Sequence, residues 1–222
     1  MAPIITTAKI VCKAKEARVK VLQAFHQIVE YAHKNEPGVL RYLVTLPLND
    51  EAGAEIYTIE EYESPVANDI HIATPPVQDL INIFTSGHVL VAAPEVHTSP
   101  IAYNKVPQST PRLLSKPAIV LTHLAYKTGT LMQALEGWKH VVDNVTANEE
   151  NTLAYTVLND EKGIEVRTVE VYENWEYVEN VHLKNPVIAE NQKKNGADIV
   201  YQGAVRLRAV DGFFGKEVRQ NL

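Results

Sequence analysis

Two histidines stand at matching places in the 222-residue chain, and either can serve as a base in catalysis. His71 and His182 each precede a proline by four residues. Around the second, Trp175, Val178 and His182 recur at the spacing of one helical face, so the imidazole shares an apolar surface. Such an imidazole can take a proton from a substrate. A core histidine bonded to a backbone carbonyl gives the same pattern, so both interpretations stay open.

A glutamate and a tyrosine two residues apart also occur twice, as Glu60 with Tyr62 and as Glu170 with Tyr172. Alternation along a strand places both members of each pair on one sheet face. A carboxylate beside a phenol can orient a histidine or shift the pKa of its neighbour. A buried acid held by hydroxyl and backbone donors has the same appearance in sequence. We take Glu170 and Tyr172, together with the two histidines, as candidate catalytic residues.

Arg167 interrupts an otherwise apolar strand, where the first half of the chain has Tyr57. A guanidinium in this place can bind an oxyanion or pair with a carboxylate, so Arg167 is a further candidate catalytic residue. The two copies also differ at a second position, where the first has His26 and the second has Lys139. These differences predict that the two halves have different duties.

Aromatic side chains at helical or strand spacing can line a pocket for an aromatic substrate, although the same spacing is typical of a core. His26 flanks the apolar stripe of the first helix and can enter a cleft from its edge. The predicted substrate-binding residues are Trp138, Trp175, Tyr155, Tyr42, Phe25, His26 and Tyr62.

These candidates occur in pairs because the chain is an internal duplication. Residues 35–42 match residues 148–155, and residues 56–63 match residues 166–173, about 110 positions apart throughout. The same offset relates His71 to His182. Three matches in the same order predict two copies of one structural unit.

Each copy predicts the same order of elements. Short runs rich in Ile, Val and Thr read as strands, and longer stretches with apolar residues three and four apart read as helices. The expected strands are 4–13, 39–46, 54–63 and 87–98 in the first copy, and 117–126, 152–158, 164–173 and 197–209 in the second. A long helix follows the first strand of each copy, and a short one begins at Ser64 or Asn174. This β-α-β-β-α-β order predicts an α+β fold of two ferredoxin-like (split βαβ) repeats, packed sheet-to-sheet as a pseudo-dimer.

Turn and proline signals set the expected boundaries. Residues 1–102 form the first repeat and residues 117–211 the second. Residues 103–116, rich in proline, are the predicted linker, and residues 212–222 a C-terminal tail.

Composition and motifs exclude several classes of function. Acids and bases are interspersed at a net charge of −6, without the basic stripe that a nucleic-acid partner requires. There is no apolar run of about 20 residues and no N-terminal signal pattern, so we expect no membrane partner and a cytoplasmic protein. One cysteine excludes an intramolecular disulfide. The histidines lack H-E-x-x-H or Cys/His spacing, which argues against a metal site.

One series of motifs occurs in both copies: Pro37-Gly38-x-Leu40-x-Tyr42, Glu60-x-Tyr62 and His71 in the first, and Leu153-x-Tyr155, Glu170-x-Tyr172 and His182 in the second. This series resembles the antibiotic-biosynthesis monooxygenase (ABM) domain of the dimeric α+β barrel superfamily. The second copy keeps the motifs but has Glu150-Asn151 in place of the Pro-Gly pair.

This resemblance implies an intramolecular dimeric α+β barrel, with a further homodimer as an option. It implies a cofactor-independent monooxygenase that oxidises an aromatic polyketide-like or phenolic intermediate with molecular oxygen, using no metal, flavin or haem. Other members of the family degrade haem. A cyclase or isomerase on a similar substrate, or a non-catalytic small-molecule-binding barrel protein, are the alternatives.

Overall fold

The computed structural model describes residues 2–106, 117–159 and 163–215. These residues form two compact units. Of the described residues, the first unit contains 2–98 and 208–215, and the second contains 99–106, 117–159 and 163–207.

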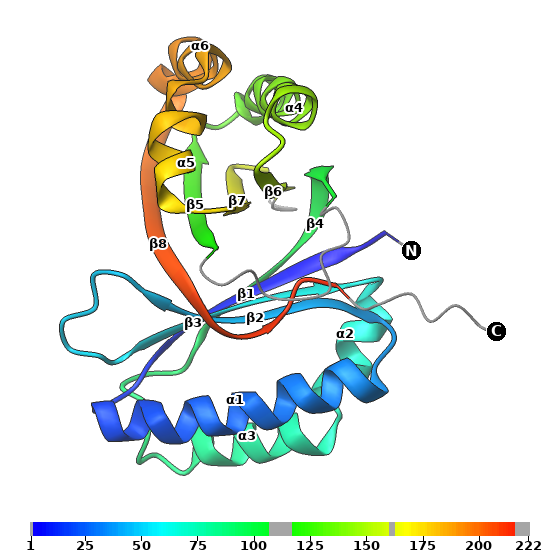
Figure 1. Ribbon diagram of the computed structural model, residues 1–222, viewed down its shortest axis with the longest axis vertical. Helices are drawn as coiled ribbons and strands as arrows, with labels where there is room; N and C mark the ends of the chain where they lie inside the picture. The colour runs from blue at the N-terminus through cyan, green and yellow to red at the C-terminus, as the bar shows by residue number, and fades with distance from the viewer. Residues whose placement is uncertain (1, 107–116, 160–162, 216–222) are drawn as a thin grey trace. The chain divides into compact units, whose positions relative to one another are not determined.

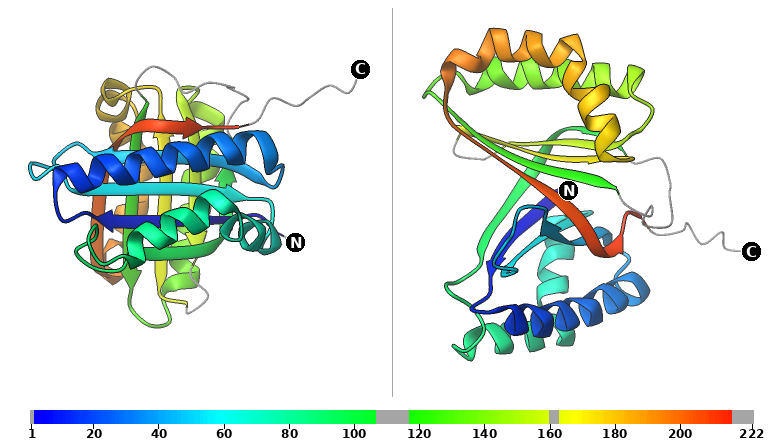
Figure 2. Two further views of the ribbon diagram at one scale, coloured as in Figure 1. Left: turned by 90° about the horizontal axis from the view of Figure 1, so that it is seen from below. Right: turned by 60° about the vertical axis from the view of Figure 1, so that its left-hand side comes forward.

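The first unit has helices on one face of an antiparallel sheet. Helices α1 and α3 lie side by side across this face (Figures 1 and 2). In chain order its elements are β1 (Ile4–Val11), α1 (Lys15–Asn35), β2 (Val39–Pro47), β3 (Glu55–Tyr62), α2 (Pro65–Ile72), α3 (Pro75–Thr85) and the beginning of β4 (Glu95–Lys105).

The second unit repeats this order. Helices α4 and α6 pack against each other, as α1 and α3 do (Figure 1). Its elements are β5 (Ala118–Tyr126), α4 (Leu131–Asn148), β6 (Thr152–Asn159), β7 (Glu165–Tyr172), α5 (Trp175–Asn180), the 3-10 turn η1 (His182–Lys184), α6 (Pro186–Asn195), the 3-10 turn η2 (Gly196–Asp198) and β8 (Ile199–Phe213).

In each unit the third strand lies between the first two. β3 pairs with β1 and β2, and β7 pairs with β5 and β6, all antiparallel. β4 and β8 each contribute to both sheets. β4 begins beside β1, where Thr6 and Thr98 share a hydrogen bond of 2.9 Å, and ends beside β6. β8 begins beside β5 and ends beside β2.

This arrangement confirms the predicted α+β class with two ferredoxin-like repeats. One prediction was too simple: the helical segment after the third strand of each unit is broken, not one short helix. Thr74 and Asn185 precede prolines and have extended backbone, with ψ of 148° and 123°. The ring of a following proline disfavours helical backbone at such a residue, so the helix stops and starts again.

The last strands are longer and later than predicted. β4 begins at Glu95 rather than residue 87, after a turn in which Gly87 has a φ of 75°. It then continues to Lys105, into the expected linker, because residues 101–105 pair with β6. β8 continues to Phe213, into the expected tail. Residues 107–116 of the expected linker and 216–222 of the expected tail lie outside the described residues.

Gly212 allows this extension of β8. It has a φ of 122°, and a Cβ built on it would lie 2.1 Å from the carbonyl oxygen of Tyr42. Any side chain there would therefore collide with β2. Each unit has its own apolar core between helices and sheet. None of the helices in the described ranges is both long and apolar enough to cross a membrane.

Candidate active site

The second unit contains a cavity of about 280 Å³ between its sheet and its helices. This volume lies just below the range for small-molecule sites, which starts at about 300 Å³. Strands β5, β6, β7 and β8 form its floor and α4, η1 and α6 its cover. Its lining includes Thr122, Tyr126, Trp138, Tyr155, Glu170, His182, Asn191, Asn195 and Arg206.

His182 lines this cavity and is oriented by a buried carboxylate. Its Nδ1 lies 3.0 Å from Oε2 of Glu149, and both residues are nearly inaccessible to solvent. A carboxylate at Nδ1 holds the proton there and leaves the lone pair on Nε2. No described residue makes a hydrogen bond with Nε2, so this nitrogen is available to a ligand in the cavity.

Glu149 is itself held by further donors. The hydroxyl of Thr152 donates to Oε2 at 2.6 Å, and the amide of Asn185 donates to Oε1 at 2.7 Å. Burial acts to raise the pKa of Glu149, but the hydrogen bonds from His182, Thr152 and Asn185 outweigh it and lower the pKa below its ordinary value. Glu149 is therefore ionised at neutral pH and fixes the tautomer of His182.

Two phenols enclose the imidazole. The ring centroids of Tyr155 and Tyr172 lie 5.6 and 4.8 Å from that of His182. The hydroxyl of Tyr172 donates to Glu170 at 2.8 Å, and Thr168 donates to the other oxygen at 2.6 Å. Burial and the charge of Glu170 raise the pKa of both tyrosines well above the usual value. The phenols therefore stay protonated at neutral pH.

Polar groups lie at other points of the cavity lining. The indole of Trp138 donates to the hydroxyl of Tyr126 at 2.9 Å. Arg206 lies over the ring of Trp175, 5.2 Å from its centroid, and pairs with Glu179 at 3.2 Å. The guanidinium is half exposed, so it can meet a ligand from the solvent side.

The first unit repeats the histidine geometry. Nδ1 of His71 lies 2.9 Å from Oε2 of Glu36, and the rings of Tyr42 and Tyr62 both lie 5.5 Å from His71. Tyr62 donates to Glu60, as Tyr172 does to Glu170. The surroundings differ, because α3 packs Leu80 and Phe84 into the apolar core where α6 has Asn191 and Asn195 at the cavity.

The structure brings together four predicted site residues as cavity lining: His182, Glu170, Tyr155 and Trp138. The hydroxyl of Tyr172 donates a hydrogen bond to Glu170, and the ring of Trp175 lies under the guanidinium of Arg206. His71, Tyr42 and Tyr62 lie together in the first unit, where Phe25 belongs to the core.

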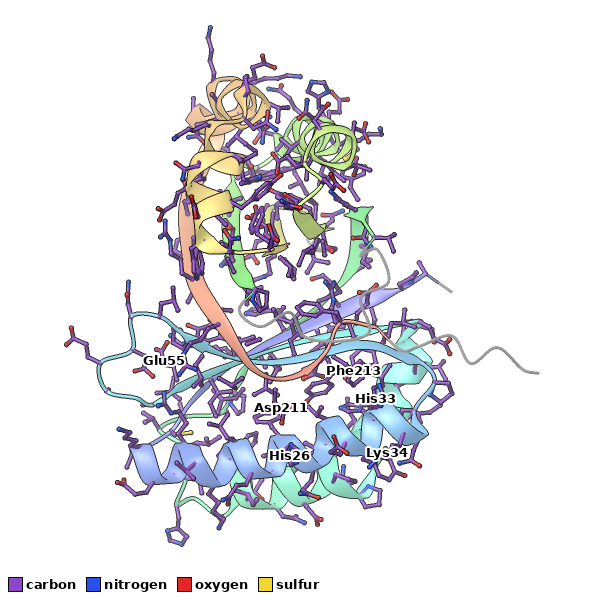
Figure 3. The ribbon with its side chains drawn as sticks, viewed as in Figure 1. His26, His33, Lys34, Glu55, Asp211 and Phe213 are labelled. Carbon is purple, nitrogen blue, oxygen red and sulfur yellow. The ribbon has the colours of Figure 1, made fainter. Side chains whose placement is uncertain are left out.

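Two predicted residues lie apart from both histidines. Arg167 alternates with Glu170 on β7 and so faces the other side of the sheet, where it pairs with Glu165 at 3.0 Å. His26 is exposed on α1 and pairs with Asp211 at 2.8 Å, at the end of β8 (Figure 3). Pairing with a neighbouring acid accounts for both side chains.

Sequence reasoning missed Glu149, Tyr126, Asn191 and Arg206. A signal for Glu149 was present, since Glu36 and Glu149 occupy matching places in the two copies, as the histidines do. Tyr126 and Asn191 have no such signal, because the first copy has Cys12 and Leu80 there. Within residues 2–106, 117–159 and 163–215, no cluster of three His, Cys, Asp or Glu side chains is arranged to hold a metal ion.

Comparison with known proteins gives a family match over the first part of the chain and a fold for the whole of it. Residues 4–82 match the family described as antibiotic biosynthesis monooxygenase. No curated protein matches the chain. The solved structure of a provisionally assigned monooxygenase from Fusobacterium nucleatum has a TM-score of 0.83 at 17% identity, covering 96% of this chain and 94% of its own.

Two more solved structures span the whole length. A provisionally assigned monooxygenase from Lactobacillus acidophilus has a TM-score of 0.76 at 16% identity, covering 95% of this chain and 100% of its own. An anthrone oxidase-like protein has a TM-score of 0.66 at 11% identity, covering 100% and 98%. At these identities the likeness shows the fold of the tandem chain.

Proposed function

Because the chain carries an antibiotic biosynthesis monooxygenase domain over residues 4–82, we propose that it is a cofactor-independent monooxygenase acting on an aromatic polyketide-like or phenolic substrate. The observation that carries the proposal is His182, whose Nδ1 is bonded to Glu149 and whose Nε2 is available in a cavity lined by aromatic residues. We place the reaction in the second unit for this reason.

The proposed reaction begins with proton transfer. Nε2 of His182 takes a proton from an acidic benzylic carbon, and the carbanion spreads its charge into the aromatic system. The carbanion gives one electron to molecular oxygen, and the resulting radical and superoxide combine as a peroxide anion on the same carbon. This anion takes the proton back from the imidazolium of His182 and becomes a hydroperoxide. Loss of the second proton from that carbon with cleavage of the O–O bond gives a ketone and hydroxide, which leaves as water. One oxygen atom enters the product and the other becomes water.

The protein's part is to orient the substrate and hold the proton. Tyr155 and Tyr172 confine the imidazole, and Glu149 stabilises the imidazolium that forms. The apolar side of the cavity, with Val120, Leu124 and Ile188, suits an aromatic ring.

An oxygen electrode tests the proposal directly. Anthrone is a suitable first substrate, since an anthrone oxidase-like protein shares this fold. Chelator-treated protein should consume one oxygen molecule for each anthrone converted to anthraquinone. His182→Ala should lower the turnover more than tenfold, in line with the usual contribution of a general base, about 10²–10⁴.

His71→Ala, the same change in the first unit, is the matched control and should leave the turnover near the wild-type level. Proton abstraction without oxygen uptake would instead indicate the cyclase or isomerase alternative. Ligand binding with neither reaction would indicate a non-catalytic barrel. Wild-type turnover in His182→Ala would remove this histidine from the mechanism.

A further inference from the structure

Three side-chain amides form a directed chain of hydrogen bonds at one side of the cavity in the second unit. Nε2 of Gln133 donates to Oδ1 of Asn195 at 3.2 Å, and Nδ2 of Asn195 donates to Oδ1 of Asn191 at 2.8 Å. Asn195 is almost completely buried, and both asparagines line the cavity. This series of hydrogen bonds therefore ends at the side chain of Asn191, which borders the cavity.

The direction of these hydrogen bonds determines which groups of the Asn191 side chain are left to bind a ligand. Its Oδ1 is occupied as an acceptor, so its two N–H groups remain as donors. No described residue accepts a hydrogen bond from them. A chain of aligned amides also polarises the last donor, which strengthens it toward an acceptor.

The first unit shows that this polarity is not required by the fold. Leu80 and Phe84 stand on α3 where Asn191 and Asn195 stand on α6, and they pack into the core. The change is matched on the neighbouring helix. α4 has Gly137, where α1 has Ala24, and a Cβ on Gly137 would lie 2.2 Å from Asn191 Oδ1 and 2.3 Å from Asn195 Nδ2. The missing side chain makes room for the two amides.

We propose that the amide of Asn191 binds the carbonyl oxygen of an enolisable aromatic ketone, and that this contact selects the substrate of the second unit. The proposal rests on the proposed function for the role of His182 as base. When His182 removes a proton from carbon, the electron pair of the broken C–H bond moves onto the carbonyl oxygen as an enolate. The donors of Asn191 then face a growing negative charge, which is the arrangement of an oxyanion site.

The matched probes are anthrone and 9,10-dihydroanthracene, which share one tricyclic frame and differ in the carbonyl oxygen. Their binding is measured without oxygen by quenching of tryptophan fluorescence. Both tryptophans of the chain, Trp138 and Trp175, lie in the second unit, and Trp138 lines the cavity. The wild-type protein should bind anthrone about threefold to tenfold more tightly, as expected for one neutral hydrogen bond.

Asn191→Asp removes the donors and keeps the acceptor for Asn195, so it should abolish the preference for anthrone. Asn191→Leu introduces the residue of the first unit and should have the same effect, which guards against misfolding of one variant. Asn82→Asp makes the same chemical change at an exposed position on α3 and should bind like the wild type. Thermal unfolding confirms that each variant is folded.

An unchanged preference in Asn191→Asp and Asn191→Leu would overturn the proposal. So would an equal loss of affinity for both probes, because it would indicate a general disturbance of the cavity, and so would a wild type without preference. The outcome is separate from that of the oxygen assay. A carbonyl preference lost in the Asn191 variants, with no oxygen uptake, would support this contact and reject the monooxygenase.

Discussion

At the scale of single residues, each of the two buried histidines is bonded to a glutamate, but the residues around the two pairs differ. Glu36 and Glu149 hold Nδ1 of His71 and His182 at 2.9 and 3.0 Å. His182 lines the cavity, and hydrogen bonds from Thr152 and Asn185 hold its partner Glu149 in place. We therefore propose that the Glu36–His71 pair is structural and that the Glu149–His182 pair is catalytic.

Glu149→Gln tests this difference. The amide can no longer stabilise the imidazolium or fix its tautomer, so we expect kcat to fall at least about tenfold. KM should change little, because Glu149 acts through His182 and does not line the cavity. Glu36→Gln, the same change in the first unit, should leave both constants unaltered. Equal losses in the two variants would contradict a single working dyad.

Single residues were predictable where the copies agree or where a side chain is large. His182, Glu170, Tyr155 and Trp138 were found in this way and do line one cavity. Arg167 was singled out as a charge in an apolar strand, but alternation along β7 turns it to the opposite face. Spacing indicates a face only when the strand register is known, and the register depends on partners far along the chain.

At the scale of elements, α3 and α6 carry the contrast between the units. Both helices begin at a proline after an extended residue, and both pack against the long helix of their unit. One presents an apolar face to that helix and the other presents amides. The sequence of α6 alone resembles a solvated helix, so its polar residues at the cavity could not be recognised without the neighbouring Gly137.

Gly137→Ala separates stability from binding at this helix contact. Alanine favours a helix by about 1 kcal/mol over glycine, while the new Cβ displaces only the flexible ends of Asn191 and Asn195. We expect the free energy of unfolding to change by less than about 1 kcal/mol. The affinity for anthrone should nevertheless fall about threefold to tenfold, because the donor is displaced.

Ala24→Gly is the reciprocal variant in the first unit. It should cost about 1 kcal/mol in chemical denaturation and leave the anthrone affinity unchanged. A Gly137→Ala protein that binds anthrone like the wild type would show that the amide chain does not position the ligand.

At the scale of the whole molecule, duplication made the fold readable and the strand boundaries hard to place. Repeated motifs predicted both β-α-β-β-α-β units, which the structure confirms. The segments 103–105 and 212–213 were assigned to a linker and a tail because proline and glycine lie nearby. They are strand instead, since hydrogen bonds to β6 and β2 are long-range contacts that local composition does not report.

Unequal units predict one ligand per chain. Leu80 and Phe84 fill the first unit where the second has polar cavity lining, so anaerobic calorimetric titration with anthrone should give a stoichiometry of one. Asn191→Leu should weaken this site without revealing another. Two equivalents of bound ligand in the wild type would show that the first unit also binds.

Lys105, at the end of β4, makes the second unit depend on a strand that begins in the first unit. Its ammonium group, buried in the second unit, donates to the carbonyl oxygens of Val145 and Glu149 at the end of α4. The strand that delivers it starts in the first unit. A shortened chain without β4 would lose both the strand that pairs with β6 and the ammonium group that binds the end of α4 next to Glu149.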